Sequence, residues 1–239
     1  MYRGLRVSSV VPAFNEEALI RRALASIPAW VDHVVVVDDG SRDDTADAAL
    51  RVGDPRIEVI RHTQNRGAGA AIVSGYRQAL AAGSDAAVVL AGDAQMDPLE
   101  MPRLLDPIAS GHADYVKGTR LGHPDLRRRM PVTRRIGNRV LSELTRLALG
   151  DGSLTDSQCG YTAISRGALE ALPLHELWPR YGYPNDLLSL LLDGGLRVAE
   201  RPVTPIYADE QSGISPWTVL PTFGFVLGRA WVRRRTGSV

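Results

Sequence analysis

The chain of 239 residues carries 28 Lys and Arg against 27 Asp and Glu, which gives a formal charge of +1. A protein this close to neutral does not coat nucleic acid, so we expect no nucleic-acid partner. The single cysteine, Cys159, excludes an intrachain disulfide and fits a reducing compartment, and Pro12 and Asn15 come too early for a signal sequence. We therefore expect a cytoplasmic protein, long enough for one large α/β domain.

Short apolar runs and amphipathic segments alternate along the first part of the chain. The apolar runs are typical of strands buried in a parallel sheet, and they cover Val7–Val11, Val34–Val37, Ile57–Ile60 and Ala86–Leu90. This alternation of strands with helical segments predicts a doubly wound, mostly parallel sheet with helices on both faces.

The segments between these runs have the spacing of helices. We expect helices from about Leu19 to Ile27, from Ser41 to Ala49 and from the Asn65–Gly69 stretch to about Ala82. Asn15 is a candidate cap for the first helix, and Ser41 with Asp44 resembles a capping box for the second.

Beyond Pro98 the alternation is less regular. Helices are expected over about Leu99–Ala109, Ile136–Leu149 and Pro184–Leu192, and strands over Asp114–Gly118, up to Ser165 and over Leu196–Val203. We divide the chain into one domain over residues 1–215 and an apolar, basic helical tail over residues 216–239.

Three of the predicted strands end in polar clusters, which are Pro12–Glu16, Asp38–Ser41 and Asp93–Gln95. Because the carboxyl ends of parallel strands share one edge of a sheet, these clusters predict a concave polar site, and a carboxylate after the second strand suits a nucleotide. Asp93 and Gln95 are two residues apart, so both face one metal ion if the backbone is extended, and their oxygen atoms suit Mg²⁺ or Mn²⁺. The chain has neither GxGxxG after its first strand nor GxxxxGK[ST], so a dinucleotide fold and a P-loop are not predicted. The five histidines show no metal-ligand spacing.

Six motifs follow in a fixed order: PAFNEE, VVVVDDGSRDDT, NRGAGAA, LAGDAQMDP, GTR and DSQCGYTAISR. In this order they resemble the family 2 inverting glycosyltransferases of GT-A fold, and among these the polyprenyl-phosphate (dolichol-phosphate) mannosyl and glucosyl transferases. The resemblance covers about Val7 to Ser215. It implies transfer of a hexose, with inversion, from a UDP- or GDP-linked donor to an acceptor, for which we favour polyprenyl phosphate.

The resemblance also implies a donor site, a metal site and an acceptor site. Asp93 would ligate Mg²⁺ or Mn²⁺ with assistance from Gln95, and Arg120 would reach a phosphate. The family often has an Asp two residues before the metal-binding one, where this chain has Ala91. The donor site would comprise Pro12, Phe14, Glu16, Val37, Asp38, Asp39, Gly67, Ala94 and Gln95, and the acceptor site Arg134, Arg135, Asp156 and Gln158.

The kind of acceptor decides whether a general base is needed. A lipid phosphate is already an anion, whereas a hydroxyl of a small molecule or glycan must lose a proton. Asp186 lies where related transferases with hydroxyl acceptors carry their catalytic carboxylate, so it is the candidate base for this alternative. Its structural interpretation is an acid in a first helical turn, favoured by the helix dipole. A second alternative is a sugar-nucleotide-binding protein without catalysis.

The tail from Pro216 is apolar and aromatic and contains Arg233, Arg234 and Arg235. It falls short of the roughly 20 apolar residues of a membrane span, and Pro221 weakens a continuous helix. One interpretation is an interfacial helix with Trp217, Phe223, Phe225 and Trp231 as anchors, which would place the protein at the cytoplasmic face of a membrane. The others are a helix packed over the acceptor site and the remnant of a membrane-tethered architecture.

Overall fold

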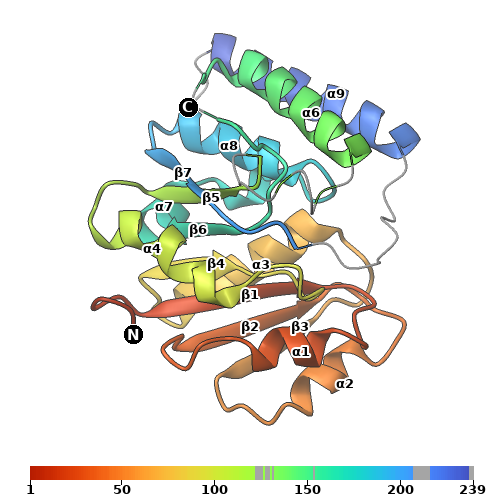
Figure 1. Cartoon of the computed structure of the whole chain (residues 1–239), viewed down its shortest axis with the longest axis vertical. Helices are drawn as coiled ribbons and strands as arrows, with labels where there is room; N and C mark the ends of the chain where they lie inside the picture. Colours follow the sequence, from red (N-terminus) through yellow and green to blue (C-terminus); the bar gives the residue numbers. More distant parts are fainter. Residues whose placement is uncertain (122–125, 127–129, 131, 153, 207–215, 237–239) are drawn as a thin grey trace.

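Within the described part of the chain, a seven-stranded sheet forms the centre of the molecule, and helices cover both of its faces (Figure 1). The computed structural model describes residues 1–121, 126, 130, 132–152, 154–206 and 216–236, without the side chains of residues 133, 134, 216–221 and 236. The strands are β1 (Val7–Ala13), β2 (His33–Asp38), β3 (Ile57–Arg61), β4 (Ala86–Val89), β5 (Tyr115–Thr119), β6 (Thr162–Ser165) and β7 (Val198–Pro202).

The order of the strands is β3-β2-β1-β4-β6-β5-β7. β1 pairs in parallel with both β2 and β4, β3 is parallel to β2, and β7 is parallel to β5. β6 lies between β4 and β5 and is antiparallel to both. The predicted α/β class with a mostly parallel sheet is therefore confirmed.

Two apolar clusters hold the helices on the two faces of the sheet. On one face, Val7 and Val11 of β1 pack with α1 (Ile20–Ala25), α2 (Thr45–Leu50) and α4 (Met101–Ala109), which follows the short helix η1 (Pro98–Glu100). On the other face, Val10 packs with α3 (Ala68–Ala81), α7 (Arg166–Ala171) and α8 (Tyr183–Asp193); η2 (Leu174–Glu176) leads into the segment before α8. The alternation of side chains along a strand explains why neighbouring valines serve opposite faces.

The two predicted helix caps are wrong, because both side chains join the loops after the strands. The Asn15 side-chain oxygen accepts a hydrogen bond from the Arg42 backbone N–H at 2.9 Å, and the Ser41 hydroxyl accepts one from the Asn15 N–H at 2.9 Å. The residues at the starts of α1 and α2, Leu19 and Asp44, make no capping bond with their side chains. The loops after β1 and β2 are thus tied to each other at the edge of the sheet.

The C-terminal tail forms one helix, α9 (Pro216–Thr236), which packs beside α6 (Val132–Leu149) and against α8 (Figure 1). The expected weakness at Pro221 does not interrupt it, because α9 buries Phe223, Val226 and Ala230 along one face. Phe223 is therefore a core residue and not a membrane anchor. The Trp217 side chain lies outside the described residues.

In the described ranges, no helix combines the length and the apolar character that a membrane span requires.

Gly75 marks the closest approach of α3 to the sheet, because a Cβ atom there would lie 2.2 Å from Cγ1 of Val10. We expect Gly75→Ala to lower the free energy of unfolding by about 1–3 kcal/mol, since the core has no room for the methyl group. Gly137→Ala in α6 is the matched control, because its Cβ would meet no atom within 4 Å. This control should raise the free energy of unfolding by about 0.5–1 kcal/mol, and urea denaturation measures both. Equal stabilisation by the two substitutions would contradict close packing at Gly75.

Candidate active site

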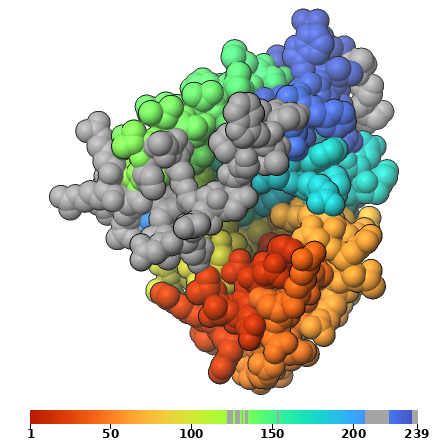
Figure 2. Space-filling model, turned by 90° about the vertical axis from the view of Figure 1, so that its right-hand side faces the viewer, coloured from red at the N-terminus to blue at the C-terminus, as the bar shows by residue number. Residues whose placement is uncertain are grey.

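A cavity of about 830 Å³ opens at the sheet edge where β1, β2 and β4 end. Its volume is in the range of sites that enclose small organic ligands. Figure 2 looks onto this edge, where the surface is hollowed between the N-terminal part in red and orange and the region of α8 in cyan. Of the residues assigned to the donor and metal sites, those that line the cavity are Pro12, Phe14, Glu16, Asp39, Gly67 and Asp93.

Asp39 connects the end of β2 to the loop before α3. One carboxylate oxygen accepts the Arg66 N–H at 2.9 Å and lies 2.6 Å from Nδ1 of His62, and the other accepts the Gly67 N–H at 2.7 Å. Nε2 of His62 lies 2.9 Å from the Ser74 hydroxyl on α3. This network holds an almost buried carboxylate at the cavity wall, where its remaining lone pairs can accept bonds from a ligand.

Four residues assigned to the donor site do not line the main cavity, and one of them, Gln95, lines a smaller hollow beside it. Val37 is buried in the sheet. Asp38 is also buried, and its carboxylate accepts the Ser41 N–H at 2.9 Å and lies 3.4 Å from Nε of Arg61. Ala94 follows Asp93 in a turn with φ of 57°, a conformation that is rare for residues other than glycine. The other three residues shape the loops that carry the site and stand behind its surface.

The turn at Asp93 differs from the extended backbone on which the metal prediction depended. The Gln95 N–H donates to a carboxylate oxygen of Asp93 at 3.0 Å, which closes a tight turn over Ala94. The turn still brings the two side chains together, because Asp93 and Gln95 line one hollow of about 60 Å³ beside the main cavity. Arg120 lines the same hollow. A left-handed non-glycine residue at this position is the kind of local strain that collects at functional sites.

The donor atoms at this turn fit a divalent cation that is shared with a substrate. Among the described residues, no group of three or more His, Cys, Asp or Glu side chains is placed to hold a metal ion. Asp93 and Gln95 supply hard oxygen atoms, and Mg²⁺ commonly completes its shell with substrate phosphates and water. The residues present therefore fit a metal bound together with a diphosphate, and Ala91 at the cavity wall adds no third ligand.

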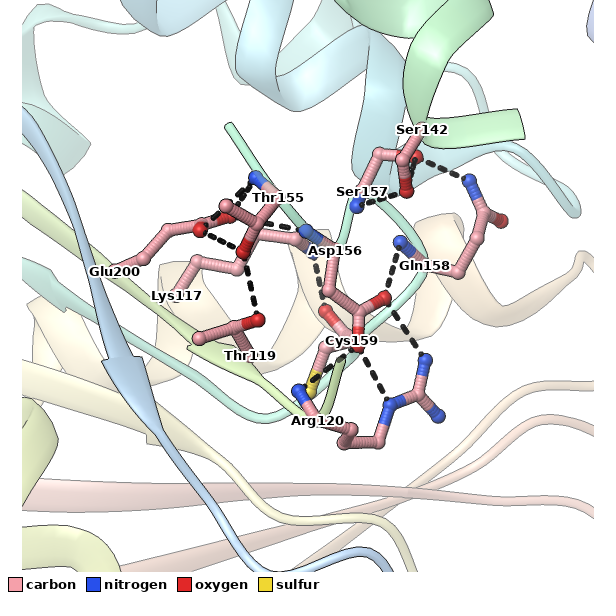
Figure 3. Close-up of polar contacts among 10 residues, drawn as sticks. All are labelled: Lys117, Thr119, Arg120, Ser142, Thr155, Asp156, Ser157, Gln158, Cys159 and Glu200. Carbon is pink, nitrogen blue, oxygen red and sulfur yellow. Dashed lines mark hydrogen bonds and ion pairs between the residues drawn. The ribbon is translucent and has the colours of Figure 1, made fainter. Parts of the chain in front are cut away.

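Arg120 is held by Asp156 in a bidentate ion pair (Figure 3). Nε of Arg120 donates to one carboxylate oxygen at 2.9 Å and Nη2 donates to the other at 3.1 Å, while the Arg120 backbone N–H donates at 3.0 Å. The Asp156 side chain is 0% exposed and that of Arg120 is 20% exposed. Asp156, assigned to the acceptor site, is thus too deeply buried to touch an acceptor, and it orients Arg120 instead.

The buried Lys117 also contacts the loop that contains Asp156. The Lys117 ammonium donates to the Cys159 carbonyl, and the Thr119 and Thr155 hydroxyls lie 2.8 Å apart (Figure 3). Burial lowers the pKa of Lys117. Burial alone would raise the pKa of Asp156, but the charges of Arg120 and Lys117 outweigh it and keep the pKa of this carboxyl below its usual 3.8. The loop therefore contains a charged carboxylate between two cations.

Two other residues assigned to the acceptor site, Arg135 and Gln158, do not line the cavity. The Gln158 amide donates to the Ser157 hydroxyl at 2.7 Å and to the Asn185 side-chain oxygen at 3.4 Å, which joins it to α8. Arg135 is half-buried on α6 and does not line either hollow. The Arg134 side chain lies outside the described residues.

Asp186 lies in the first turn of α8, as predicted, and its side chain is 0% exposed. One carboxylate oxygen accepts the Trp178 N–H at 2.7 Å, and the other accepts Nη1 of Arg233 at 2.9 Å. Nη1 of Arg229 lies 3.7 Å from the first oxygen. Both oxygens of the candidate base are therefore engaged within the protein.

Sequence reasoning missed the wall that faces the strand ends. This wall comes from the segment before α8, from the first residue of α8 and from α9, and its lining residues are Trp178, Arg180, Tyr181, Tyr183 and Thr222. No spacing rule relates these positions to the strand ends, because they approach the cavity only through the packing of α8 and α9. His62 was missed because it bonds to a carboxylate and belongs to no metal-ligand pattern.

A mostly parallel sheet with a cavity at the carboxyl ends of its strands is the arrangement in which α/β enzymes bind nucleotides and other small ligands. The model of the family named Glycosyl transferase family 2 matches residues 8–172. The chain belongs to this family.

Curated relatives agree with this assignment. The UDP-N-acetylglucosamine--dolichyl-phosphate N-acetylglucosaminyltransferase of Methanococcus voltae is 31% identical over 215 residues, which cover 84% of this chain and 85% of the relative. The polyprenol monophosphomannose synthase of Mycolicibacterium smegmatis is 31% identical over 218 residues, which cover 88% of this chain and 80% of the relative.

Among solved structures, glucosyl-3-phosphoglycerate synthase from Mycobacterium tuberculosis has a similar fold. Its complex with phosphoglyceric acid gives a TM-score of 0.69 at 28% identity, covering 97% of this chain and 80% of that one. Its complex with Mn²⁺, UDP and glucosyl-3-phosphoglycerate gives a TM-score of 0.68 at 26% identity, covering 99% of this chain and 81% of that one.

The buried ion pair between Arg120 and Asp156 predicts a pH-dependent loss in Asp156→Asn. Because the pKa of Asp156 is lowered in the folded state, its stabilisation is present above pH 3.8 and is lost as pH falls through the folded pKa. At pH 7 we expect the substitution to lower the free energy of unfolding by on the order of 3 kcal/mol, since it removes the negative partner from a buried ion pair.

Denaturation from pH 7 down to pH 3 measures this effect. The difference between wild type and Asp156→Asn should stay constant to about pH 5 and shrink below pH 3.8. Asp114→Asn, which removes a more exposed pair with Arg197, is the matched control and should lose less than about 1 kcal/mol. Equal losses in the two variants would contradict a special role of the buried pair.

Proposed function

We propose that this chain transfers a hexose from a UDP- or GDP-linked donor to polyprenyl phosphate, with inversion of the anomeric carbon and with Mg²⁺ or Mn²⁺. The single observation that supports this acceptor is the state of Asp186, the candidate base, which is buried and bonded through both oxygens. A phosphate acceptor is already an anion and reacts without a general base. The names of the curated relatives, which include dolichyl-phosphate and polyprenol acceptors, favour the same class.

The proposed donor site combines an aromatic ring with a fixed carboxylate. Phe14 is 42% exposed at the cavity wall, so that its ring is available to stack on a nucleobase. Asp39, fixed by the Arg66 and Gly67 N–H groups, is placed to accept hydrogen bonds from the nucleoside. The M. tuberculosis complexes contain UDP with Mn²⁺, which supports UDP and Mn²⁺ over GDP and Mg²⁺.

The diphosphate would lie between these groups and the turn at Asp93. A divalent ion held there by Asp93 and Gln95 would stabilise the charge that develops on the leaving nucleoside diphosphate. Arg120, which lines the same hollow, adds a fixed positive charge next to this position. Because Asp156 already orients the guanidinium, little reorganisation is needed when the charge develops.

A hydroxyl acceptor is the second candidate. The structural neighbour glucosyl-3-phosphoglycerate synthase was crystallised with phosphoglyceric acid, and the two folds are closely similar. In this alternative Asp186 would have to leave Arg233 and the Trp178 N–H before it could accept a proton.

Transfer of labelled sugar from UDP- and GDP-sugars, with Mn²⁺ present, tests the proposal. We expect lipid-linked product with undecaprenyl phosphate and no product with phosphoglyceric acid. Asp93→Ala should lower the rate by about 10²-fold or more, as expected when a group that stabilises the transition state is removed.

Asp97→Ala is the matched control for this substitution. Asp97 accepts the Leu99 N–H at the start of η1 and does not line either hollow, so its loss should affect stability and leave transfer almost unchanged. Transfer to phosphoglyceric acid alone would favour the hydroxyl alternative. Nucleotide binding without transfer to either acceptor would favour the non-catalytic one.

The outer surface of α6 and α9 is suited to contact with an anionic membrane. Five exposed apolar residues of α6 are spaced four, four, four and three residues apart and so share one face. Phe225 and Trp231 are exposed on the neighbouring helix α9. α6 and α9 together contain eight arginines and one glutamate, a net charge of +7, so the rest of this +1 chain has a net charge of −6. The exposed residues of α6 are Val132, Ile136, Val140, Leu144 and Leu147.

This contact, peripheral and at the cytoplasmic face, predicts sedimentation with vesicles that contain phosphatidylglycerol. Because each basic residue near an anionic surface contributes about 1 kcal/mol, binding to neutral phosphatidylcholine vesicles should be roughly tenfold weaker or more, and salt should weaken binding. Ile136→Glu with Val140→Glu should reduce binding. Leu50→Glu, at an exposed apolar residue of α2, should leave it unchanged. Equal binding of all three proteins would contradict the assignment of this surface.

A further inference from the structure

The cavity wall opposite the strand ends is formed by residues 177–182, which we call the wall segment. Trp178, Arg180 and Tyr181 of this segment line the cavity. The segment contains no helix or strand, so its position depends on contacts with neighbouring elements. Three elements make these contacts, namely α3 on the donor side and α8 and α9 on the far side.

On the donor side, the segment is fitted closely to the start of α3. The Pro179 carbonyl accepts the Ala70 N–H at 2.9 Å. A Cβ atom on Gly69 would lie 2.2 Å from the Trp178 carbonyl oxygen, so the two backbones touch. A displacement of the wall segment would therefore also displace the start of α3 and the adjacent Gly67, whose N–H donates to Asp39.

On the far side, two arginines one turn apart on α9 contact Glu176 and Asp186, the residues that flank the segment in the sequence. Arg233 donates to Asp186 at 2.9 Å and lies 3.2 Å from the Glu176 carboxylate. Arg229 donates to the Glu176 carbonyl at 2.9 Å and lies 3.7 Å from Asp186. Asp186 in turn accepts the Trp178 N–H at 2.7 Å, so that it links the cations of α9 to the backbone of the segment.

Aromatic contacts also join the wall segment to α9. The Trp178 ring lies 5.2 Å from the Phe225 ring, and the Tyr181 ring lies 5.8 Å from the Phe223 ring. Both partners belong to α9, and Thr222 of the same helix lines the cavity. The C-terminal helix is therefore part of the site, although its sequence lies outside the motifs of the family.

We propose that Asp186 is a positioning residue. Arg229 and Arg233 of α9 hold its carboxylate, and the carboxylate in turn fixes the wall segment and so sets the shape of the donor cavity. This role rests on the proposed use of the cavity for a nucleotide sugar. It differs from the role of a general base, because Asp186 acts through the Trp178 backbone and never touches the acceptor. It also predicts that an arginine remote from the cavity surface, Arg233, has the same effect on catalysis as Asp186.

Steady-state kinetics and hydrogen exchange on the full chain test this role. Asp186→Asn and Arg233→Gln should each raise the donor KM by roughly tenfold, as expected for the loss of one charge-assisted hydrogen bond, and change kcat by less than about threefold. The double variant should be no worse than the more severe single variant, because both remove the same contact. Arg233→Lys, which keeps the charge, should recover most of the loss.

Hydrogen exchange gives a readout that does not depend on any acceptor or donor. Peptides covering residues 177–183 should exchange faster in Asp186→Asn and in Arg233→Gln than in wild type, while β1 and β2 stay protected. Arg51→Gln, which removes a cation from an exposed ion pair with Asp44, is the matched control and should change neither kinetics nor exchange.

Two results would overturn the proposal. A fall in kcat of about 10²-fold or more in Asp186→Asn but not in Arg233→Gln would identify Asp186 as a general base. Unchanged exchange over residues 177–183 in both variants would show that the clamp does not hold the segment. If wild type transfers sugar to no acceptor, the proposed function fails, and the exchange result alone decides the role of Asp186.

Discussion

The parallel pairing of β1 with β2 and with β4 is the constraint on which the site depends. The register places Ala13 beside Asp38, and the Leu90 N–H donates to the Val10 carbonyl just beyond the end of β4. Three loops therefore leave the sheet at one edge, and the Asn15, Ser41 and Arg42 hydrogen bonds tie two of them together. Asp39 ties the second loop to the start of α3. The strand order therefore brings the Phe14 ring and the carboxylates of Asp39 and Asp93 to one side of the cavity.

Buried carboxylates fix arginines at two places in the second half of the molecule. Asp156 holds Arg120 next to the turn at Asp93, and Asp186 is held by Arg233 of α9. Both carboxylates are fully buried, and their arginines are partly exposed. Removing water from a carboxylate is costly, so each buried acid requires good geometry and additional donors, which the Arg120 and Trp178 backbone N–H groups provide. The arrangement orients groups at the site with little freedom left in their side chains.

The proteins similar to this chain differ in the acceptors to which their names or complexes refer. The curated relatives from Methanococcus voltae and Mycolicibacterium smegmatis are named for lipid phosphate acceptors, whereas the similar solved structure was crystallised with phosphoglyceric acid. One fold therefore accompanies different acceptors, as is common for folds that present variable loops on a shared sheet. In this chain Asp186 is engaged by Arg233, and the surface of α6 and α9 combines exposed apolar residues with arginines.

Local patterns in the sequence determined the α/β class, most strands and helices, and the convergence of Phe14, Asp39 and Asp93 at one sheet edge. These features follow from runs of valine and from short polar loops, which are patterns among residues close together in the sequence. The helix caps were wrong because Asn15 and Ser41 bond across two loops, which is a tertiary contact. The burial of Asp156, the turn at Ala94 and the wall formed by Trp178 and Arg180 were also decided only in three dimensions. The sequence placed Asp186 correctly in a first helical turn but did not indicate its partner 47 residues away, Arg233, since only the packing of α9 on α8 brings these charges together.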